Sequence, residues 1–493
     1  MPVRRCALAS IWGELMSVSY RKEDSTTPDS PLTHDQSVYL ETYAVARPRP
    51  AVVVRPVQRR SVAARRLDKS VGARPELLLP ERLWLFLLGA TSALPLMNFT
   101  ATAFSLVCIS VSGAYFLPGS RRHNFTPMLL AVVGTAAYLM SALANDTSVF
   151  SPTVLAFAAF GLYVCGITVL ARDLTRILTV ALGLVSGSAA FYLIFGTYLT
   201  ASGSVDDIWK YGIAPAVTVF ALYLAAMLRM RAVACSVLLL VLALVSLMLN
   251  FRSHALVCCA VVLLLVMAKY RRGALSIVPR LCTVVVFGVT FSWALEYAAR
   301  EGFLGQSLRE KVLSQSDGSV PMILAGRTEP VLSITSIIDR PLLGWGQANN
   351  IAPETYAHAQ QVALGLGFDR SFPFQYVWKF PDGSLSLHSI VLGSWAEAGI
   401  LALLLPLWLL WACYRLIFVS EAAGLWMPLL MYLGVQGVWD LLYSPWSYNL
   451  PAMFAVIACS CIALQGKGRH RAGSGSSTRS FRRRTTPPTV RTA

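Results

Sequence analysis

Charged residues are scarce in this sequence, and their scarcity excludes most classes of protein. Only 14% of its 493 residues are Asp, Glu, Lys or Arg, whereas 55% are hydrophobic and the mean hydropathy is +0.57. A soluble globular protein carries roughly a quarter charged residues, so this chain cannot cover a water-exposed surface. Soluble enzymes, disulfide scaffolds and disordered chains are therefore excluded, and the composition predicts a polytopic membrane protein.

Motifs for metals, nucleotides and disulfides are also lacking. Of ten cysteines, Cys6 lies in the N-terminal tail; the other nine lie in apolar segments without metal-ligand spacing and are interpreted as small buried hydrophobes. The sequence has no Walker A motif, no dinucleotide fingerprint and no HExxH motif. A nucleotide-driven pump and a zinc membrane protease are therefore not expected, and no cofactor or metal site is predicted.

Long apolar windows are abundant instead, and they predict an all-α membrane domain over residues 83–465. Each window is long enough to cross about 30 Å of hydrocarbon as a helix. We expect about twelve transmembrane helices, at 83–98, 100–118, 128–144, 152–171, 177–200, 212–228, 232–249, 255–268, 274–298, 388–411, 424–441 and 449–465.

Basic residues are concentrated in the two tails. Residues 1–82 and 466–493 carry +13 of the net charge of +17 and are predicted to be largely disordered. Short connections on one side of the windows hold ten Lys and Arg, against two on the other side. The positive-inside rule therefore places both termini on the cytoplasmic side of the membrane, where the tails meet membrane lipids. A nucleic-acid partner is not expected.

One connection is much longer than the others. Residues 299–387 form a segment of 89 residues with seven basic and eight acidic side chains, on the side opposite the tails. Proline in the first helical turn predicts helices that start at Glu329-Pro330 and at Pro353-Glu354. An ordered insertion of this length is usually functional, so we expect a large extracytoplasmic loop that carries function.

Three residues on the outer side are candidates for chemistry. His388 opens a predicted helix at its water-facing end and can accept a proton near neutral pH, although a histidine that only caps the helix is an alternative. Arg252 suits an anion clamp for a diphosphate or, alternatively, snorkels to lipid headgroups. Arg327 precedes a predicted helix start, where an anion site can form, or it pairs with Glu329 in a solvated loop.

Carboxylates on the outer side are interpreted as supporting groups. Asp440 lies in an apolar segment, where an ionised residue needs a partner, and Arg252 is the partner that the sequence suggests. Glu397 follows His388 by nine residues, roughly 180° around a helix, and is interpreted as a packing or loop anchor. The pair Asp206-Asp207 favours a hydrated loop over a metal site, because no third ligand is near in sequence.

Three stretches occur together in a characteristic order. They are NFRSHAL with Arg252, Gly326-Arg327 followed by RPLLGWGQANN, and His388 followed by Glu397-Ala398-Gly399. In this order around one large outer loop, they resemble motifs of the bacterial O-antigen ligase and O-antigen polymerase family. The similarity covers about 230–450, and the helix pattern agrees over 83–465.

The resemblance implies a metal-independent, inverting membrane glycosyltransferase whose donor is a glycan on undecaprenyl or a related polyprenyl diphosphate. In that case Arg252 and Arg327 would bind the leaving diphosphate. His388 would take a proton from the hydroxyl of a glycan or lipid acceptor, with Asp440 and Glu397 in support. A flippase and a chain-length regulator would be its protein partners.

Several readings of the function stay open at this point. A repeat-unit polymerase for capsule, exopolysaccharide or O-antigen is favoured slightly over a ligase that attaches finished glycan to a lipid or protein. A lipid-linked oligosaccharide flippase is less favoured, because we see no internal repeat and the single large loop is lopsided. A metal-dependent sugar transferase would place an acidic pair in the first outer loop, where this sequence has no acidic residue.

Overall fold

The computed structural model describes residues 79–97, 101–117, 125–199, 204–270, 277–303, 328–370, 372–379, 387–446 and 449–476, with a few single residues between them. Most of the two predicted tails lies outside these ranges. The described part of the C-terminal tail is helical, because the last helix continues to Ser476, past the predicted boundary at residue 465.

Every one of the twelve apolar windows contains an α-helix. These helices are α3 (Leu79–Ala90), α4 (Ala103–Ser112), α5 (Thr126–Ala144), α6 (Pro152–Leu170), α7 (Leu174–Leu199), α9 (Ala214–Met227), α10 (Ala232–Met248), α11 (Arg252–Tyr270), α12 (Ile277–Arg300), α18 (Ile390–Val419), α19 (Met427–Tyr443) and α20 (Leu450–Ser476). Among the described residues, six helical stretches are long and apolar enough to cross a membrane. This agrees with the all-α membrane class that the composition predicts.

Short elements connect these helices. They are the 3-10 turns η1 (Thr91–Ala93), η2 (Gly113–Phe116) and η5 (Ser420–Trp426), the strands β1 (Pro95–Met97) and β2 (Ala101–Thr102), the short helix α8 (Val205–Ile208) and the π-helical turn η3 (Trp209–Ile213). The strands pair in antiparallel fashion. Strand β1 lies where the window 83–98 predicts helix, and β2 lies at the start of the window 100–118. Helix α3 ends early because Pro95 lacks an N–H and holds Leu94 in an extended conformation.

Helix α18 is broken within its apolar stretch, where the sequence predicts one continuous helix over 388–411. Gly399 has φ 74° and ψ −173°, which is not helical. The break frees backbone carbonyl groups that a helix would pair, and such groups need other partners inside a membrane protein. A lone glycine in an apolar run does not reveal such a break, because helices often tolerate one.

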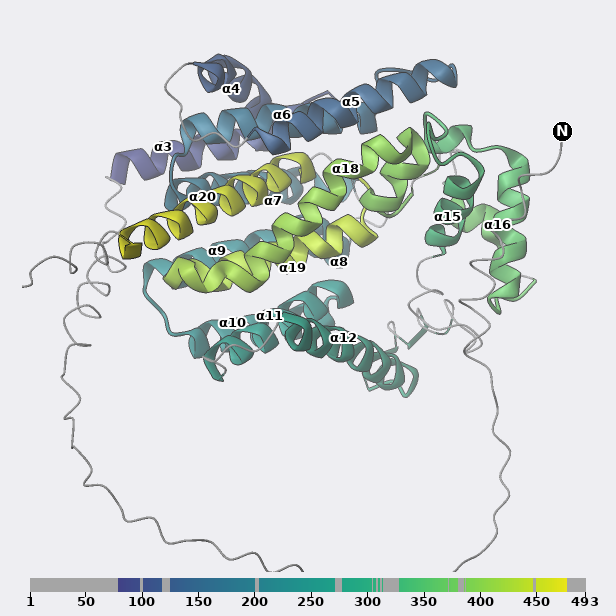
Figure 1. Ribbon diagram of the computed structural model, residues 1–493. Helices are drawn as coiled ribbons and strands as arrows, with labels where there is room; N and C mark the ends of the chain where they lie inside the picture. The colour runs from purple at the N-terminus through teal and green to yellow at the C-terminus, as the bar shows by residue number, and fades with distance from the viewer. Residues whose placement is uncertain are drawn as a thin grey trace, which may run out of the picture. The chain divides into compact units, whose positions relative to one another are not determined.

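Helix α18 makes the most extensive packing contacts of the bundle. It packs against α5, α19 and α20, and near the break it meets helix α15 of the long loop (Figure 1). Helices α10 and α11 pack on each other, α11 also packs against α19, and α12 packs against α11. Helices α11, α18 and α19 are therefore parts of one packed unit.

The long loop contains helices of its own. These are α15 (Glu329–Asp339), α16 (Pro353–Gly365), α17 (Phe374–Trp378) and the 3-10 turn η4 (Ala348–Asn350). The two predicted helix starts, at Glu329-Pro330 and Pro353, are confirmed. Buried side chains such as Leu332, Trp345 and Phe374 form a small hydrophobic core separate from that of the bundle. The described part of the loop is thus an ordered substructure.

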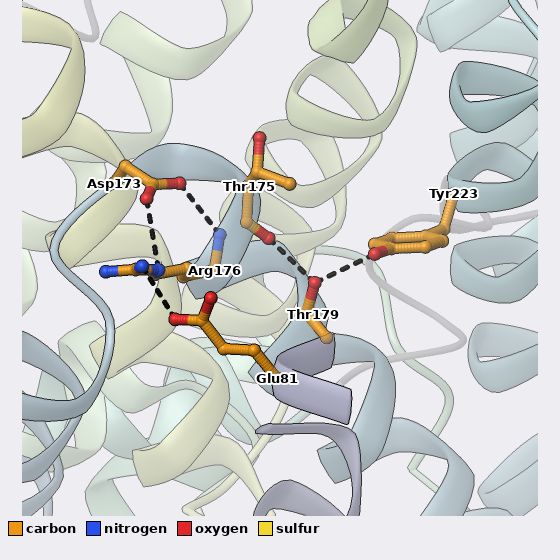
Figure 2. A network of polar contacts seen from close by, with 6 residues as sticks. All are labelled: Glu81, Asp173, Thr175, Arg176, Thr179 and Tyr223. Carbon is orange, nitrogen blue, oxygen red and sulfur yellow. Dashed lines mark hydrogen bonds and ion pairs between the residues drawn. The ribbon is translucent and has the colours of Figure 1, made fainter. Parts of the chain in front are cut away.

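At the opposite ends of the helices, a polar network joins α3, α7 and α9 (Figure 2). The Arg176 guanidinium lies 2.6 Å from the Glu81 carboxylate and 3.4 Å from that of Asp173. One turn further along α7, the Thr179 hydroxyl is 2.8 Å from the hydroxyl of Tyr223. These contacts fix the start of α7 against its two neighbours.

Candidate active site

His388 lies just outside the membrane helix that follows it. The hydroxyl of Ser389 accepts a hydrogen bond from the Leu392 N–H (3.2 Å) and so caps the start of α18. This capping leaves His388 in the connection between the loop and the helix. Its side chain is 27% exposed, so a solute on this side can reach it.

The partner of His388 is Glu329, the first residue of α15. Nδ1 of His388 lies 3.1 Å from Oε1 of Glu329, whose side chain is only 12% exposed. A carboxylate beside Nδ1 favours the tautomer that carries its proton there and leaves Nε2 as the acceptor. It also stabilises the imidazolium that forms when Nε2 takes a proton. The contact is an ion-pair distance and not a hydrogen bond, because Nδ1 of His388 has no hydrogen-bond partner among the described residues. The arrangement supports a general base with a carboxylate beside it.

The sequence identified His388 but missed Glu329 as its partner. The sequence suggests Glu329 only as a partner of Arg327, which lies outside the described residues. The available signal was an acidic residue directly before a helix-initiating proline. The start of α15 is fixed by buried Thr328, whose hydroxyl oxygen accepts a hydrogen bond from Nε1 of Trp378 (3.0 Å).

Glu397 anchors the loop to the broken helix, as the sequence interpretation proposed. Its Oε1 accepts a hydrogen bond from the Ala348 N–H (3.2 Å), and its Oε2 accepts one from the Tyr138 hydroxyl (3.1 Å). Its backbone carbonyl accepts from the Gly346 N–H (2.8 Å) and from the Ser141 hydroxyl (2.8 Å). These bonds supply partners for a carbonyl group that the helix break leaves free.

The segment RPLLGWGQANN therefore docks directly onto Glu397-Ala398-Gly399. The Trp345 N–H donates to the Ala396 carbonyl (3.0 Å), next to the Gly346 bond. Gly344 has φ 69°, and a Cβ there would collide with the backbone of Glu397. Glycine is required at this position because the two backbones approach so closely. Two of the three stretches that carry the family resemblance thus form one contact.

Asp440 has other partners than the one suggested by the sequence. Its Oδ1 accepts hydrogen bonds from Nε2 of Gln436 (3.0 Å) and from the hydroxyl of Ser444 (3.2 Å), both one turn away on or beside α19. Tyr432 is the residue of α19 whose ring meets that of His254, with centroids 6.2 Å apart. Asp440 is eight residues further along the chain, or about 12 Å along the helix axis.

Arg252 begins α11, where a short connection fixes the backbone. Asn250 has φ 54°, a conformation that asparagine tolerates at a helix end, and its Nδ2 donates to Oδ2 of Asp206 (2.8 Å). The Glu296 carboxylate of α12 acts electrostatically on Arg252. The same carboxylate pairs with Arg300 at 2.9 Å, so two guanidinium groups share one negative charge there.

His254, two residues after Arg252 in α11, is fully buried, and its role is structural. Its Nδ1 lies 2.8 Å from the Ser246 hydroxyl and its Nε2 3.0 Å from the Thr218 hydroxyl. The two bonds tie α11 to α10 and α9. Because both ring nitrogens have partners, this histidine holds the first turn of α11, and with it Arg252, in place.

The structure brings some of the predicted residues together. His388 and Asp440 are linked through their neighbours, since the Ser389 hydroxyl donates to the Leu441 carbonyl (3.4 Å). Glu397 lies two turns into the same helix start, whereas Arg252 lies on α11 beside Glu296. Within the described ranges, no group of three or more His, Cys, Asp or Glu residues is placed to hold a metal ion.

Searches with protein-family models and among curated proteins find no match to this chain. The family resemblance therefore rests on the residues of the three stretches alone.

Proposed function

We propose that this protein transfers glycan from a polyprenyl-diphosphate donor to an acceptor hydroxyl at the extracytoplasmic face of a bacterial cell membrane. In this proposal twelve helices cross the membrane, both tails are cytoplasmic, and the loop of residues 299–387 faces outward. The excess of ten basic residues against two in the short connections supports this orientation. Repeat-unit polymerisation is the favoured reaction, and ligation is the alternative.

The observation that carries the proposal is the 3.1 Å contact between His388 and Glu329 on the loop side. Nε2 of His388 takes the proton of the acceptor hydroxyl as its oxygen attacks the anomeric carbon of the donor. The new glycosidic bond forms while the bond between that carbon and the diphosphate oxygen breaks, and the electron pair leaves with the diphosphate. A base positioned in this way contributes about 10²–10⁴-fold.

Arginine is the residue type suited to the leaving group. The guanidinium of Arg252 presents a fork of N–H donors that matches phosphate oxygens, and Arg327 is proposed to act with it. Such contacts strengthen as negative charge develops on the diphosphate, and removing one donor of this kind typically costs ~10²–10³ in rate. Attack from the side opposite the diphosphate inverts the anomeric configuration.

Deletion of the gene in its native host, followed by sizing of the glycans on the polyprenyl-diphosphate carrier, tests the proposal. Accumulation of single repeat units with loss of long polymer supports a polymerase. Accumulation of long carrier-linked chains supports a ligase. An unchanged carrier-linked pool would show that the proposed function is wrong.

Complementation with variants connects the activity to the site. Wild-type protein should restore the glycan pattern, whereas His388→Ala protein present in the membrane at the same level should not. Asp207→Asn is a matched control that removes a charge in the predicted outer connection, because Asp207 lies in α8, which packs on α7 and η3. Full restoration by His388→Ala would exclude this histidine as the base.

A further inference from the structure

A cavity of about 250 Å³ lies directly beside the connection that holds His388. It is enclosed by the start of α6, the loop around η4, the first turns of α18 and the residues after α19. We call it the outer cavity. Its polar lining residues are Ser151, Thr153, Gln347, Asn349, Ser389, Ser394 and Glu397.

The lining has the chemistry of a carbohydrate site. Hydroxyl and amide groups can both donate to and accept from sugar hydroxyls. The carboxylate of Glu397 accepts hydrogen bonds from the Tyr138 hydroxyl and the Ala348 N–H, which fix its oxygens at the wall of the cavity. The indole of Trp446, half-buried against Phe157 and Phe454, supplies an apolar wall. Pockets that combine such a wall with a few fixed polar groups are typical of small-molecule sites.

The charge of the lining excludes the diphosphate as its occupant. Among the lining residues that the structure describes, none is a lysine or an arginine, and the only charged side chain is that of Glu397. An anionic group would be repelled there, whereas a neutral ring with several hydroxyl groups would not. The volume is also below the ~300–1,000 Å³ of pockets for drug-sized ligands, which suits a single sugar ring.

The position of the cavity relative to His388 decides which sugar it suits. Leu387 and Ser389, on either side of His388 in the chain, both line it. A ring held there therefore contacts both chain neighbours of the proposed base. The acceptor is the substrate whose hydroxyl must reach that base.

We infer that the outer cavity binds one neutral sugar ring of the acceptor glycan and presents its hydroxyl to His388. This inference rests on the proposed function and adds the site and chemical class of the acceptor. The amide of Asn349 is a recognition group in it. Its Oδ1 accepts a hydrogen bond from the Leu385 N–H, which leaves the Nδ2 donors for a sugar hydroxyl.

Gly393 offers a way to fill the cavity without disturbing the helix. It lines the cavity, its backbone is helical, and a Cβ there meets only Leu387 at ordinary contact distances of 3.4 Å and more. In Gly393→Leu the added side chain occupies the space of the sugar. Gly288→Leu in α12 is the matched control, because a Cβ at Gly288 has nothing within 4 Å.

The first measurement is the binding of methyl glycosides of common hexoses to the full-length protein in nanodiscs, by calorimetry. A single ring is expected to bind with a dissociation constant on the order of 1–10 mM. Gly393→Leu should weaken that binding at least about tenfold, while Gly288→Leu leaves it unchanged. Asn349→Asp, which keeps the oxygen that accepts from Leu385 but loses the amide donors, should weaken it roughly three- to tenfold.

The results separate this inference from the proposed function. Absence of binding by every glycoside, or equal binding by wild-type protein and both cavity variants, would overturn the sugar site. In the deletion strain, Gly393→Leu protein of wild-type thermal stability should fail to restore the glycan pattern. Restoration by it would overturn the acceptor role even if the deletion confirms the glycosyltransferase. Glycoside binding with an unchanged carrier-linked pool would support a sugar site and overturn only the proposed reaction.

Discussion

Gly399 lies so close to the Leu342 carbonyl group that a side-chain carbon at this glycine would overlap it. The contact joins the break in α18 to the loop segment that begins at Arg340. Gly399 also has φ 74°, a conformation that costs a residue with a Cβ about 1–3 kcal/mol. Two independent features therefore require glycine at residue 399: its close approach to the Leu342 carbonyl group and its positive φ.

The first prediction follows from this contact. Gly399→Ala should lower the free energy of unfolding by about 2–4 kcal/mol, because the methyl group forces the loop segment away from the helix. Thermal unfolding of the purified protein followed by intrinsic fluorescence measures the effect. Gly393→Ala, on the same helix but without a clash, should be neutral or stabilising by about 0.5–1 kcal/mol. Equal stability of the two variants would contradict the required close approach.

The second prediction concerns the buried carboxylate of Glu397. Glu397→Gln should fold with a loss of less than about 1 kcal/mol, because the amide oxygen can still accept from the Ala348 N–H and the Tyr138 hydroxyl can accept from the amide nitrogen. Glu397→Leu should cost about 3 kcal/mol or more, since it leaves the Ala348 N–H and the Tyr138 hydroxyl buried without partners.

The same unfolding measurement includes Tyr138→Phe, which removes one donor to Glu397 and should cost about 1–3 kcal/mol. The energies of Tyr138→Phe and Glu397→Leu should not add, because both remove the same 3.1 Å hydrogen bond. Strict additivity would mean that the two groups do not interact in the folded protein.

The sequence predicted the positions of the helices well because their signals are local. Apolar windows mark the twelve helices, and prolines at residues 330 and 353 mark two helix starts in the loop. The break at Gly399 was missed, since it depends on the docking of the loop segment and not on its neighbours in sequence. The predicted end of the first helix, at residue 98, was also wrong. The helix ends at Ala90, and strand β1, which begins at Pro95, takes the place of its last predicted turns.

The candidate site was predicted only in part, for a physical reason. His388 carries its own signal at the water-facing end of an apolar run, but its contact with Glu329 depends on how α15 packs against α18. The suggested pairing of Arg252 with Asp440 required the relative depth of α11 and α19. Hydrophobic periodicity identifies which face of a helix is buried. It does not determine the offset of one helix relative to another along their axes.

The third prediction tests the pair of His388 and Glu329. His388→Ala should lower the transfer rate about 10²–10⁴-fold, and Glu329→Gln should lower it at least about tenfold, because the amide cannot stabilise the imidazolium. Adding Glu329→Gln to His388→Ala should cause little further loss, since both act on one proton transfer. Glu354→Gln, an exposed acid at the start of α16, is the control. A full tenfold further loss in the double variant would mean that Glu329 acts independently of His388.

The fourth prediction concerns the charge arrangement around Arg252. Arg252→Ala should reduce the transfer rate about 10²–10³-fold if its guanidinium meets the leaving diphosphate. Arg252→Lys should recover only part of it, because an ammonium group cannot make the bidentate contact. Arg300→Lys keeps the positive charge beside Glu296 and serves as the control for the cluster. Transfer assays at saturating acceptor, with binding of pyrophosphate measured in parallel, distinguish the role of Arg252 from a structural one.

A purely structural role for Arg252 predicts a different outcome. If Arg252 only balanced Glu296, then the triple variant Arg252→Gln, Glu296→Gln and Arg300→Gln would recover activity, because no charge of the cluster would be left without a partner. A diphosphate ligand requires the positive charge itself, so the triple variant should stay as inactive as Arg252→Gln alone and should bind pyrophosphate equally weakly. Recovery of activity in the triple variant would therefore remove Arg252 from the diphosphate site and leave it as part of an ion-pair cluster between α11 and α12.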